Sequence, residues 1–202
     1  MKFLKKLMVV LLTVIMILPL TAHAAGTDSP AKRDLANATI TTKTLTYNGK
    51  TQKATLTVKI GDQTLTEGTH FTVVGDRTKK NAGTYTLKIK GIGKYTGTQT
   101  VTFTVKKAAQ KVKVTGTSIK SGVKTYKASS LKKSSKTFRL KVTRKANAKV
   151  TYSAPSKKIT VSKTGKVTVK KGTKKGTYKV YVKTKATKNY KASTKIIKIR
   201  VK

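Results

Sequence analysis

The segment GTYKVYVKTKATKNYKASTKIIKIRVK, residues 176–202, has the clearest structural pattern in the chain. It predicts two β-strands joined by a loop, because apolar and cationic residues alternate in both halves. Side chains alternate faces along a strand, so each predicted strand has one core face and one cationic face. The residues of the core face are Tyr178, Val180, Val182, Ile197, Ile199 and Val201.

Similar segments recur along the chain from about residue 39, separated by turns rich in Gly and Asn. The residues that dominate them, Thr, Val, Ile and Tyr, favour a pleated and half-buried backbone. Short strands at this spacing predict an antiparallel sandwich or barrel. Gly61-Asp62 is predicted to form a two-residue hairpin turn, and residues 129–135 are predicted to form a loop. The predicted strands are 39–46, 54–60, 71–74, 84–90, 98–105, 112–115, 138–142, 150–152, 159–161, 167–169, 178–185 and 196–201.

The chain contains an internal repeat. The sequence GTYTLKIK at 83–90 matches GTYKVYVK at 176–183, and the two copies begin 93 residues apart. The segment KKAAQK, residues 106–111, lies between the two parts. We therefore predict two related β modules, at 38–107 and 108–202, each of a normal size for a small sandwich.

The N-terminus has the pattern of a cleaved secretory signal peptide, residues 1–24. A basic start is followed by an apolar run, Leu7 to Leu20, and then by the small residues Ala22 and Ala24. The alternative is a membrane anchor, but a run of 14 residues is shorter than the ~20 needed to span a bilayer. We expect cleavage after Ala24 and a flexible polar leader at 25–37.

The motifs in both modules resemble those of known families. In the first module, YNGK at 47–50, LTEGTHFTV at 65–73, NAGT at 81–84 and GIGKYTGT at 91–98 resemble the Ig-like repeat of Gram-positive secreted and cell-surface proteins. The second module is similar to the bacterial Ig-like group 2 domains of adhesin and invasin type. The segments that carry this second resemblance are VTYS at 150–153, VSKTGKV at 161–167 and ATKNY at 186–190. Together the resemblances imply an all-β fold of two tandem Ig-like antiparallel β-sandwich modules, extracellular, with no catalytic residues.

The aromatic residues are expected to fill the two cores, since they are the largest apolar side chains available. Tyr181 is the exception, because it shares a predicted strand face with Lys179 and Lys183. The expected core aromatics are Phe71, Tyr85, Tyr95 and Phe103 in the first module, and Tyr126, Phe138, Tyr152, Tyr178 and Tyr190 in the second.

Residues able to support catalysis are scarce, so we predict that the protein is not an enzyme and has no cofactor or metal site. After removal of the signal peptide, His70 is the one histidine, and the chain has no cysteine. Positioned acids, bases or nucleophiles are required for most reactions. Glu67 and Asp76 are expected to be surface turn residues.

The charge is large and uneven. The chain has 47 Lys and Arg residues against 5 Asp and Glu, a net charge of +42. Removal of the signal peptide would leave a net charge of +39. Every acidic residue lies at or before Asp76, and the 30 Lys and Arg residues from Lys111 onward have no acidic counterpart. Soluble domains normally intersperse both signs, so this region must be screened by salt or by a polyanion.

Two interpretations of this charge remain open. In the first, the protein is a surface-associated, adhesin-like module held by its lysine-rich face on an anionic polymer: a cell-wall polymer, extracellular DNA or a sulfated glycan. In the second, it is a structural spacer whose lysines serve solubility; a secreted enzyme or toxin is a remote third alternative. Lysine is a point charge and arginine is scarce, which favours non-specific contacts over sequence-specific nucleic-acid recognition. The predicted polyanion-binding residues are Lys179, Lys183, Lys185, Lys198, Arg200 and Lys202.

Overall fold

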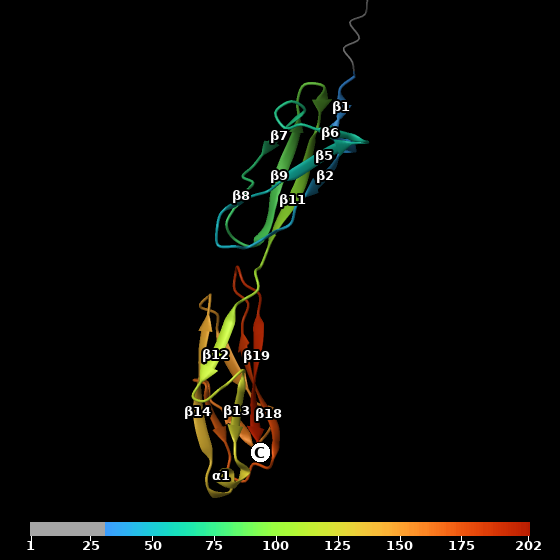
Figure 1. Ribbon diagram of the computed structural model, residues 1–202. Helices are drawn as coiled ribbons and strands as arrows, with labels where there is room; N and C mark the ends of the chain where they lie inside the picture. Colours follow the sequence, from blue (N-terminus) through green and yellow to red (C-terminus); the bar gives the residue numbers. More distant parts are fainter. Residues whose placement is uncertain (1–30) are drawn as a thin grey trace, which may run out of the picture. The chain divides into compact units, whose positions relative to one another are not determined.

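The computed structural model describes residues 31–202 of the chain, and these residues form an all-β protein (Figure 1). The predicted signal peptide and residues 25–30 of the predicted leader lie outside the described residues. We call the elements at 33–106 the first module and those at 112–201 the second module. The elements of the first module are β1 (Arg33–Asp34), a 3-10 helix (Leu35–Asn37), β2 (Thr39–Thr42), β3 (Leu45–Thr46), β4 (Gln52–Lys53), β5 (Leu56–Ile60), β6 (Gln63–Leu65), β7 (Phe71–Val74), β8 (Thr78–Lys79), β9 (Gly83–Gly91), β10 (Tyr95–Thr96) and β11 (Thr98–Lys106).

The second module contains eight strands and one short helix. Its elements are β12 (Val112–Gly116), β13 (Val123–Tyr126), α1 (Ala128–Lys133), β14 (Lys136–Arg144), β15 (Val150–Ser153), β16 (Ile159–Val161), β17 (Lys166–Val169), β18 (Gly176–Thr184) and β19 (Ser193–Val201).

The strands of the second module are divided between two four-stranded sheets in the Ig-like order. One sheet has the order β12-β14-β17-β16 and the other has the order β13-β19-β18-β15. If β13 is set aside and the remaining strands are lettered A to G along the chain, these sheets are ABED and GFC, as in the immunoglobulin fold. Strand β13 adds a parallel edge, in which Val123 lies opposite Lys198 and Tyr126 opposite Val201.

The core of the second module is formed by the inner faces of both sheets. Phe138, Leu140 and Val167 from one sheet share a buried cluster with Val180 and Ile199 from the other. Strands β18 and β19 pair antiparallel along nine residues each, which confirms the hairpin predicted for 176–202. All six residues predicted for its core face are either buried or packed against this cluster.

The first module also places a small sheet beside a four-stranded one. The strand orders of the two sheets are β2-β5-β6 and β3-β11-β9-β7. In the larger sheet, β3 is an edge strand and pairs in parallel with β11. Strands β5 and β6 form a hairpin in which Ile60 lies opposite Gln63, so the turn at Gly61-Asp62 is confirmed. The buried side chains at the centre of the first module include Val58, Phe71 and Ile89.

The predicted flexible leader, 25–37, is wrong for its last residues. Residues 33–37 form β1 and the 3-10 helix, and β1 pairs in parallel with β10. Leu35 is fully buried in the first core. The side-chain amide of Gln99 donates hydrogen bonds to the carbonyl groups of Leu35, Ala36 and Ala38, which holds this segment on β11.

Two local predictions in the second module are also wrong. Residues 129–135 were expected to form a loop, but α1 covers most of them and buries Leu131. Tyr190 was expected in the second core. Its ring instead meets that of Tyr47 edge-on, with the ring centres 5.3 Å apart.

Further contacts join the same part of the chain to the first module. The Asn189 side chain accepts a hydrogen bond from the Ala82 N–H at 2.8 Å and donates one to the Asn81 side chain at 3.0 Å. The backbone of Ala108 exchanges hydrogen bonds with Asn189 and Lys191. Tyr190 and its neighbours are therefore committed to this contact and leave the second core to the other aromatics.

Candidate functional site

The residues predicted to bind a polyanion are all exposed, and four of them share one face. Lys179 and Lys183 lie on β18, and Lys198 and Arg200 lie on β19, with their side chains on the side of the sheet opposite the core. Lys185 and Lys202 follow the last residues of β18 and β19. Because these strands are antiparallel, the two residues lie at opposite ends of the face. We call this face the GFC face.

Like charges lie directly opposite each other on the GFC face. Lys179 is paired with Lys198 across the two strands, whereas Lys183 lies opposite Thr194. Like charges in directly opposite positions destabilise a sheet. The fold therefore retains an unfavourable pair where a neutral residue would relieve the repulsion.

An apolar pair interrupts the lysines of the GFC face. Tyr181 lies opposite Ile196, and Ile196 is 45% exposed. Tyr181 borders a hollow of about 340 Å³. It was predicted to lie outside the core on the same strand face as Lys179 and Lys183, and the structure places it there. The residues that line the hollow are Ser153, Ala154, Pro155, Tyr181, Lys183 and Thr194.

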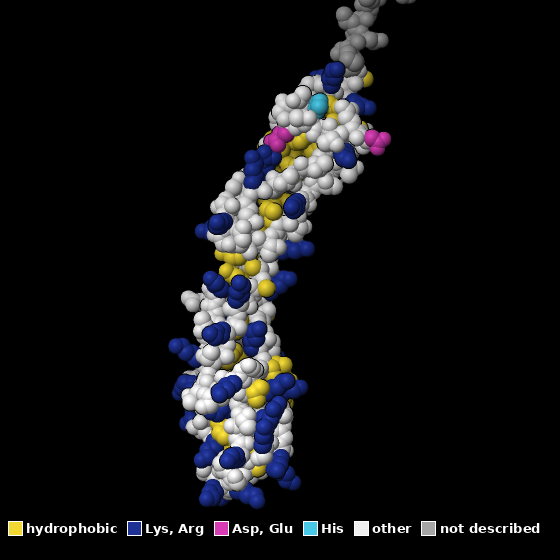
Figure 2. Space-filling view, in the orientation of Figure 1, with side chains coloured by type: hydrophobic (Ala, Val, Ile, Leu, Met, Phe, Trp, Pro, Cys, Tyr) yellow, Lys and Arg dark blue, Asp and Glu magenta, His cyan; other side chains and the backbone are white. Residues whose placement is uncertain are grey.

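The outer face of the other sheet is equally cationic, and this was missed in the sequence analysis. Lys113, Lys141, Arg139 and Lys166 are exposed on it, and Arg139 lies directly opposite Lys166. Figure 2 shows Lys and Arg side chains distributed over the second module, whereas Asp and Glu appear on the first module alone on the face in view. The alternation of basic and apolar residues at 112–116 and 136–144 could have indicated this second cationic face. The basic residues are spread over a longer segment at 176–202, and the prediction was limited to that segment.

One lysine of the second module points inward. Lys124 lies on the edge strand β13 and is 9% exposed. Its Nζ donates to the Thr117 carbonyl at 2.7 Å and lies 5.5 Å and 5.7 Å from the ring centres of Tyr126 and Phe138. An ammonium group over aromatic faces is stabilised by their quadrupoles. An inward charge on an edge strand also opposes pairing with another chain.

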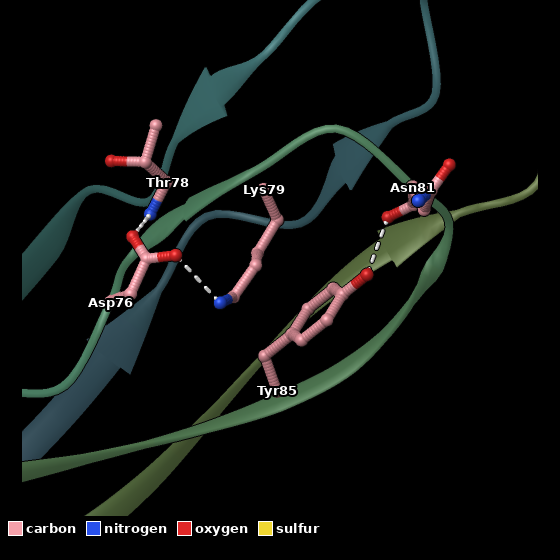
Figure 3. Close-up of polar contacts among 5 residues, drawn as sticks. All are labelled: Asp76, Thr78, Lys79, Asn81 and Tyr85. Carbon is pink, nitrogen blue, oxygen red and sulfur yellow. Dashed lines mark hydrogen bonds and ion pairs between the residues drawn. The ribbon is translucent and has the colours of Figure 1, made fainter.

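Two acidic residues of the first module, Glu67 and Asp76, form local ion pairs. Glu67 pairs with Arg77 at 2.8 Å, and Asp76 pairs with Lys79 at the same distance. In Figure 3 the Asp76 carboxylate also accepts the Thr78 N–H, and the hydroxyl of Tyr85 donates to the Asn81 carbonyl. The hydrogen bond from Lys79, followed by that from Thr78, lowers the pKa of Asp76 below its ordinary value. As expected, Glu67 and Asp76 are exposed at the surface.

His70 has a structural environment. Its Nδ1 accepts the N–H of Thr66 at 2.8 Å, and its ring meets that of Tyr95 edge-on at 5.1 Å. Within residues 31–202, no three His, Asp or Glu side chains gather where they could hold a metal ion. In the same range, no helix is long and apolar enough to cross a membrane.

The chain matches no protein-family model and no curated protein. Among solved structures it is similar to Drosophila N-cadherin EC1-4, with 13% identity over 79% of this chain and 47% of that chain and a TM-score of 0.37. It is also similar to extracellular domains 3-5 of Drosophila OTK, with 7% identity over 82% of this chain and 61% of that chain and a TM-score of 0.40. A third is the titin Ig tandem A164-A165, with 12% identity over 82% of this chain and 96% of that chain and a TM-score of 0.30. The chain spans about half to two thirds of the length of the first two.

Proposed function

We propose that this protein is an exported, non-enzymatic binding module of the Gram-positive cell surface, held on an anionic polymer by the cationic faces of its second module. Export and the bacterial surface are inferred from the N-terminal sequence and from the Ig-like motifs described above. The binding proposal depends on one observation: cations cover both outer faces of a sandwich that contains no acidic residue.

The position of the charges supports attachment. Lys179 faces Lys198 across the GFC face, and Arg139 faces Lys166 across the other sheet. Solubility would be served equally well by a mixture of both signs, which avoids self-repulsion. A polyanion laid on either face would turn each of these repulsive pairs into two favourable contacts.

The cations also indicate how the polymer would be bound. The six residues predicted for the GFC face include one arginine, Arg200. Lysine provides a mobile point charge, whereas arginine provides the planar fork that recognises a phosphate or a base in one geometry. Binding is therefore expected to follow charge density along the polymer, to release counterions, and to weaken as salt increases.

A salt titration against purified wall polymer, DNA and heparin tests the proposal. The Lys179→Gln/Lys198→Gln double variant removes the opposed pair from the GFC face. The matched control is Lys88→Gln/Lys90→Gln on β9, which removes two exposed lysines that lie opposite threonines in the first module. We expect the slope of log K against log salt to fall by about 2 for the first variant, and by less for the control. Equal slopes, or no binding at low salt, would contradict attachment through the second module.

One observation favours a second candidate function, a structural spacer whose lysines serve solubility. Lys124 on the edge strand β13 is an inward charge that discourages edge-to-edge pairing, and this role needs no ligand. Under this alternative, neutralising the GFC face would increase self-association and leave polymer retention unchanged. Sedimentation of the double variant described above therefore distinguishes the two functions.

A further inference from the structure

A hollow of about 670 Å³ lies at the start of β12, where β12, β14 and β19 meet, outside the GFC face. Four exposed lysines and the partly buried Arg144 line it, and the second module has no acid to neutralise them. The residues around the hollow are Gln110, Lys111, Val112, Lys113, Thr143, Arg144, Lys145 and Lys195.

The side chain of Gln110 gives this hollow its chemical character. Gln110 is 7% exposed, and both its Nε2 and its Oε1 are buried without a hydrogen-bond partner. The Nε of Arg144 beside it is buried and unpartnered as well. Buried polar atoms are almost always paired, so a native group left without a partner calls for an explanation such as a bound molecule.

Hydrogen bonds fix the backbone on both sides of Gln110, whereas its side-chain amide makes none. Ala108 exchanges backbone hydrogen bonds with Asn189 and Lys191, and Val112 is paired with Arg144 in the sheet. The amide group itself has no hydrogen bond to break. Only packing therefore opposes a turn of the Gln110 side chain into the hollow that it lines.

We propose that this hollow binds one oxyanion of a hydroxyl-bearing ligand, a phosphate or sulfate ester of a sugar or polyol. The lysines and the Arg144 guanidinium supply cationic donors to the ester oxygens. The Gln110 amide supplies a donor and an acceptor, so it suits an oxyanion with a hydroxyl on a neighbouring carbon. This inference rests on the proposed function, since it names the unit of the anionic polymer that a specific pocket would accept.

The test uses the full chain and small, single-site probes: glycerol 3-phosphate, glucose 3-sulfate, methyl phosphate and glycerol, titrated by NMR at low salt. A saturable shift of the Gln110 side-chain NH₂ signals by one of the two hydroxyl-bearing esters supports the pocket. The ester that binds more tightly identifies phosphate or sulfate as the source. Equal binding of methyl phosphate, equal binding of glycerol, or no saturable shift would overturn the proposal and leave ordered water as the occupant.

Two variants separate the pocket from the overall charge. Lys195→Gln removes a lysine of the hollow, and Lys198→Gln removes an exposed lysine from the same strand outside it. We expect Lys195→Gln and Gln110→Leu to weaken the small ester about tenfold, the loss of roughly one charge-assisted hydrogen bond, and Lys198→Gln to change it little. Gln110→Leu also removes the unpartnered polar atoms, so its fold is expected to persist, and Lys195→Gln tests the pocket independently.

The failure of this inference can be distinguished from failure of the proposed function. If Lys195→Gln and Lys198→Gln weaken the small ester equally, the pocket is overturned, whereas salt-sensitive polymer binding would still stand. If the small ester binds as expected but no polymer is retained at low salt, attachment to a polymer is wrong and the pocket stands as a site for a small ligand.

Discussion

Reversing one charge of the opposed pair on the GFC face should stabilise the second module. Lys179 and Lys198 are both exposed and directly opposite. Two unit charges about 6 Å apart in water repel by about 0.7 kcal/mol, and a Debye length of ~8 Å reduces this to about 0.3 kcal/mol. Lys198→Glu replaces the repulsion by an attraction of similar size, so the free energy of unfolding should rise by about 0.6 kcal/mol, within the range known for cross-strand pairs.

The control for this substitution is Lys183→Glu. Lys183 lies on the same face but opposite Thr194, so the control changes the net charge equally without forming an opposed pair. In thermal unfolding followed by circular dichroism, Lys198→Glu should melt about 3 °C above the control. The difference should increase at about 10 mM salt and nearly vanish at about 1 M, where the Debye length is ~3 Å. If the control melts as high as Lys198→Glu at low salt, the cross-strand repulsion inferred from the register is wrong.

Three further results are expected. Ile199→Ala, at a fully buried position of the second core, should cost about 3 kcal/mol of unfolding free energy, whereas Ile196→Ala on the exposed face should cost less than about 0.5 kcal/mol in the same denaturant titration. The pKa of Asp76 is lowered in the folded protein, so its contribution to stability is present above about pH 4 and lost as pH falls through the lowered pKa; Lys79→Gln should raise this pKa in a ¹³C NMR titration, and an unchanged value would contradict the ion pair. Asn189→Ala should speed hydrogen exchange at the first-module amide that its side chain caps, while core amides stay protected.

The part of the fold that could be predicted is the part in which a side chain's polarity matches its final position. Strands β18 and β19 alternate over most of their length, because Val180 and Ile199 face the core while Lys179 and Lys198 face water. The same rule located Phe71–Val74 with its observed bounds. Local pattern is sufficient for such strands because one face of each is buried against the opposite sheet.

The missed elements depend on partners that are distant in the sequence. Strand β13 has a lysine, Lys124, on its inner face. The polar residue in its sequence pattern therefore marks the buried face of the strand, where an exposed face would be expected. Leu35 is a lone apolar residue in a polar stretch, and it becomes ordered because Gln99, 64 residues later, donates to its carbonyl. Tyr190 is a large aromatic residue of the kind that fills a core, yet its ring packs against Tyr47 of the other module.

The sequence predicted the positive charge of the candidate site, but it did not predict all the surfaces that belong to the site. The exposed positions of Lys179, Lys183, Lys198 and Arg200 follow from the period of two in their strands. The hollow beside Gln110 gave no sequence signal, because one glutamine in a polar linker becomes distinctive only when folding buries its amide without a partner.

The position of β19 has a consequence for the order in which this protein can acquire its structure. Strand β19 lies between β13 and β18, and its pairing with β13 joins residues 75 positions apart, such as Val123 and Lys198. A ribosome delivers Ser193–Val201 only after every other strand of the module has been made. Until then the GFC sheet has no centre, and such long-range pairing is slow to form. A nascent chain is therefore expected to stay unfolded in this region for most of its synthesis, which is the state that the proposed export would require.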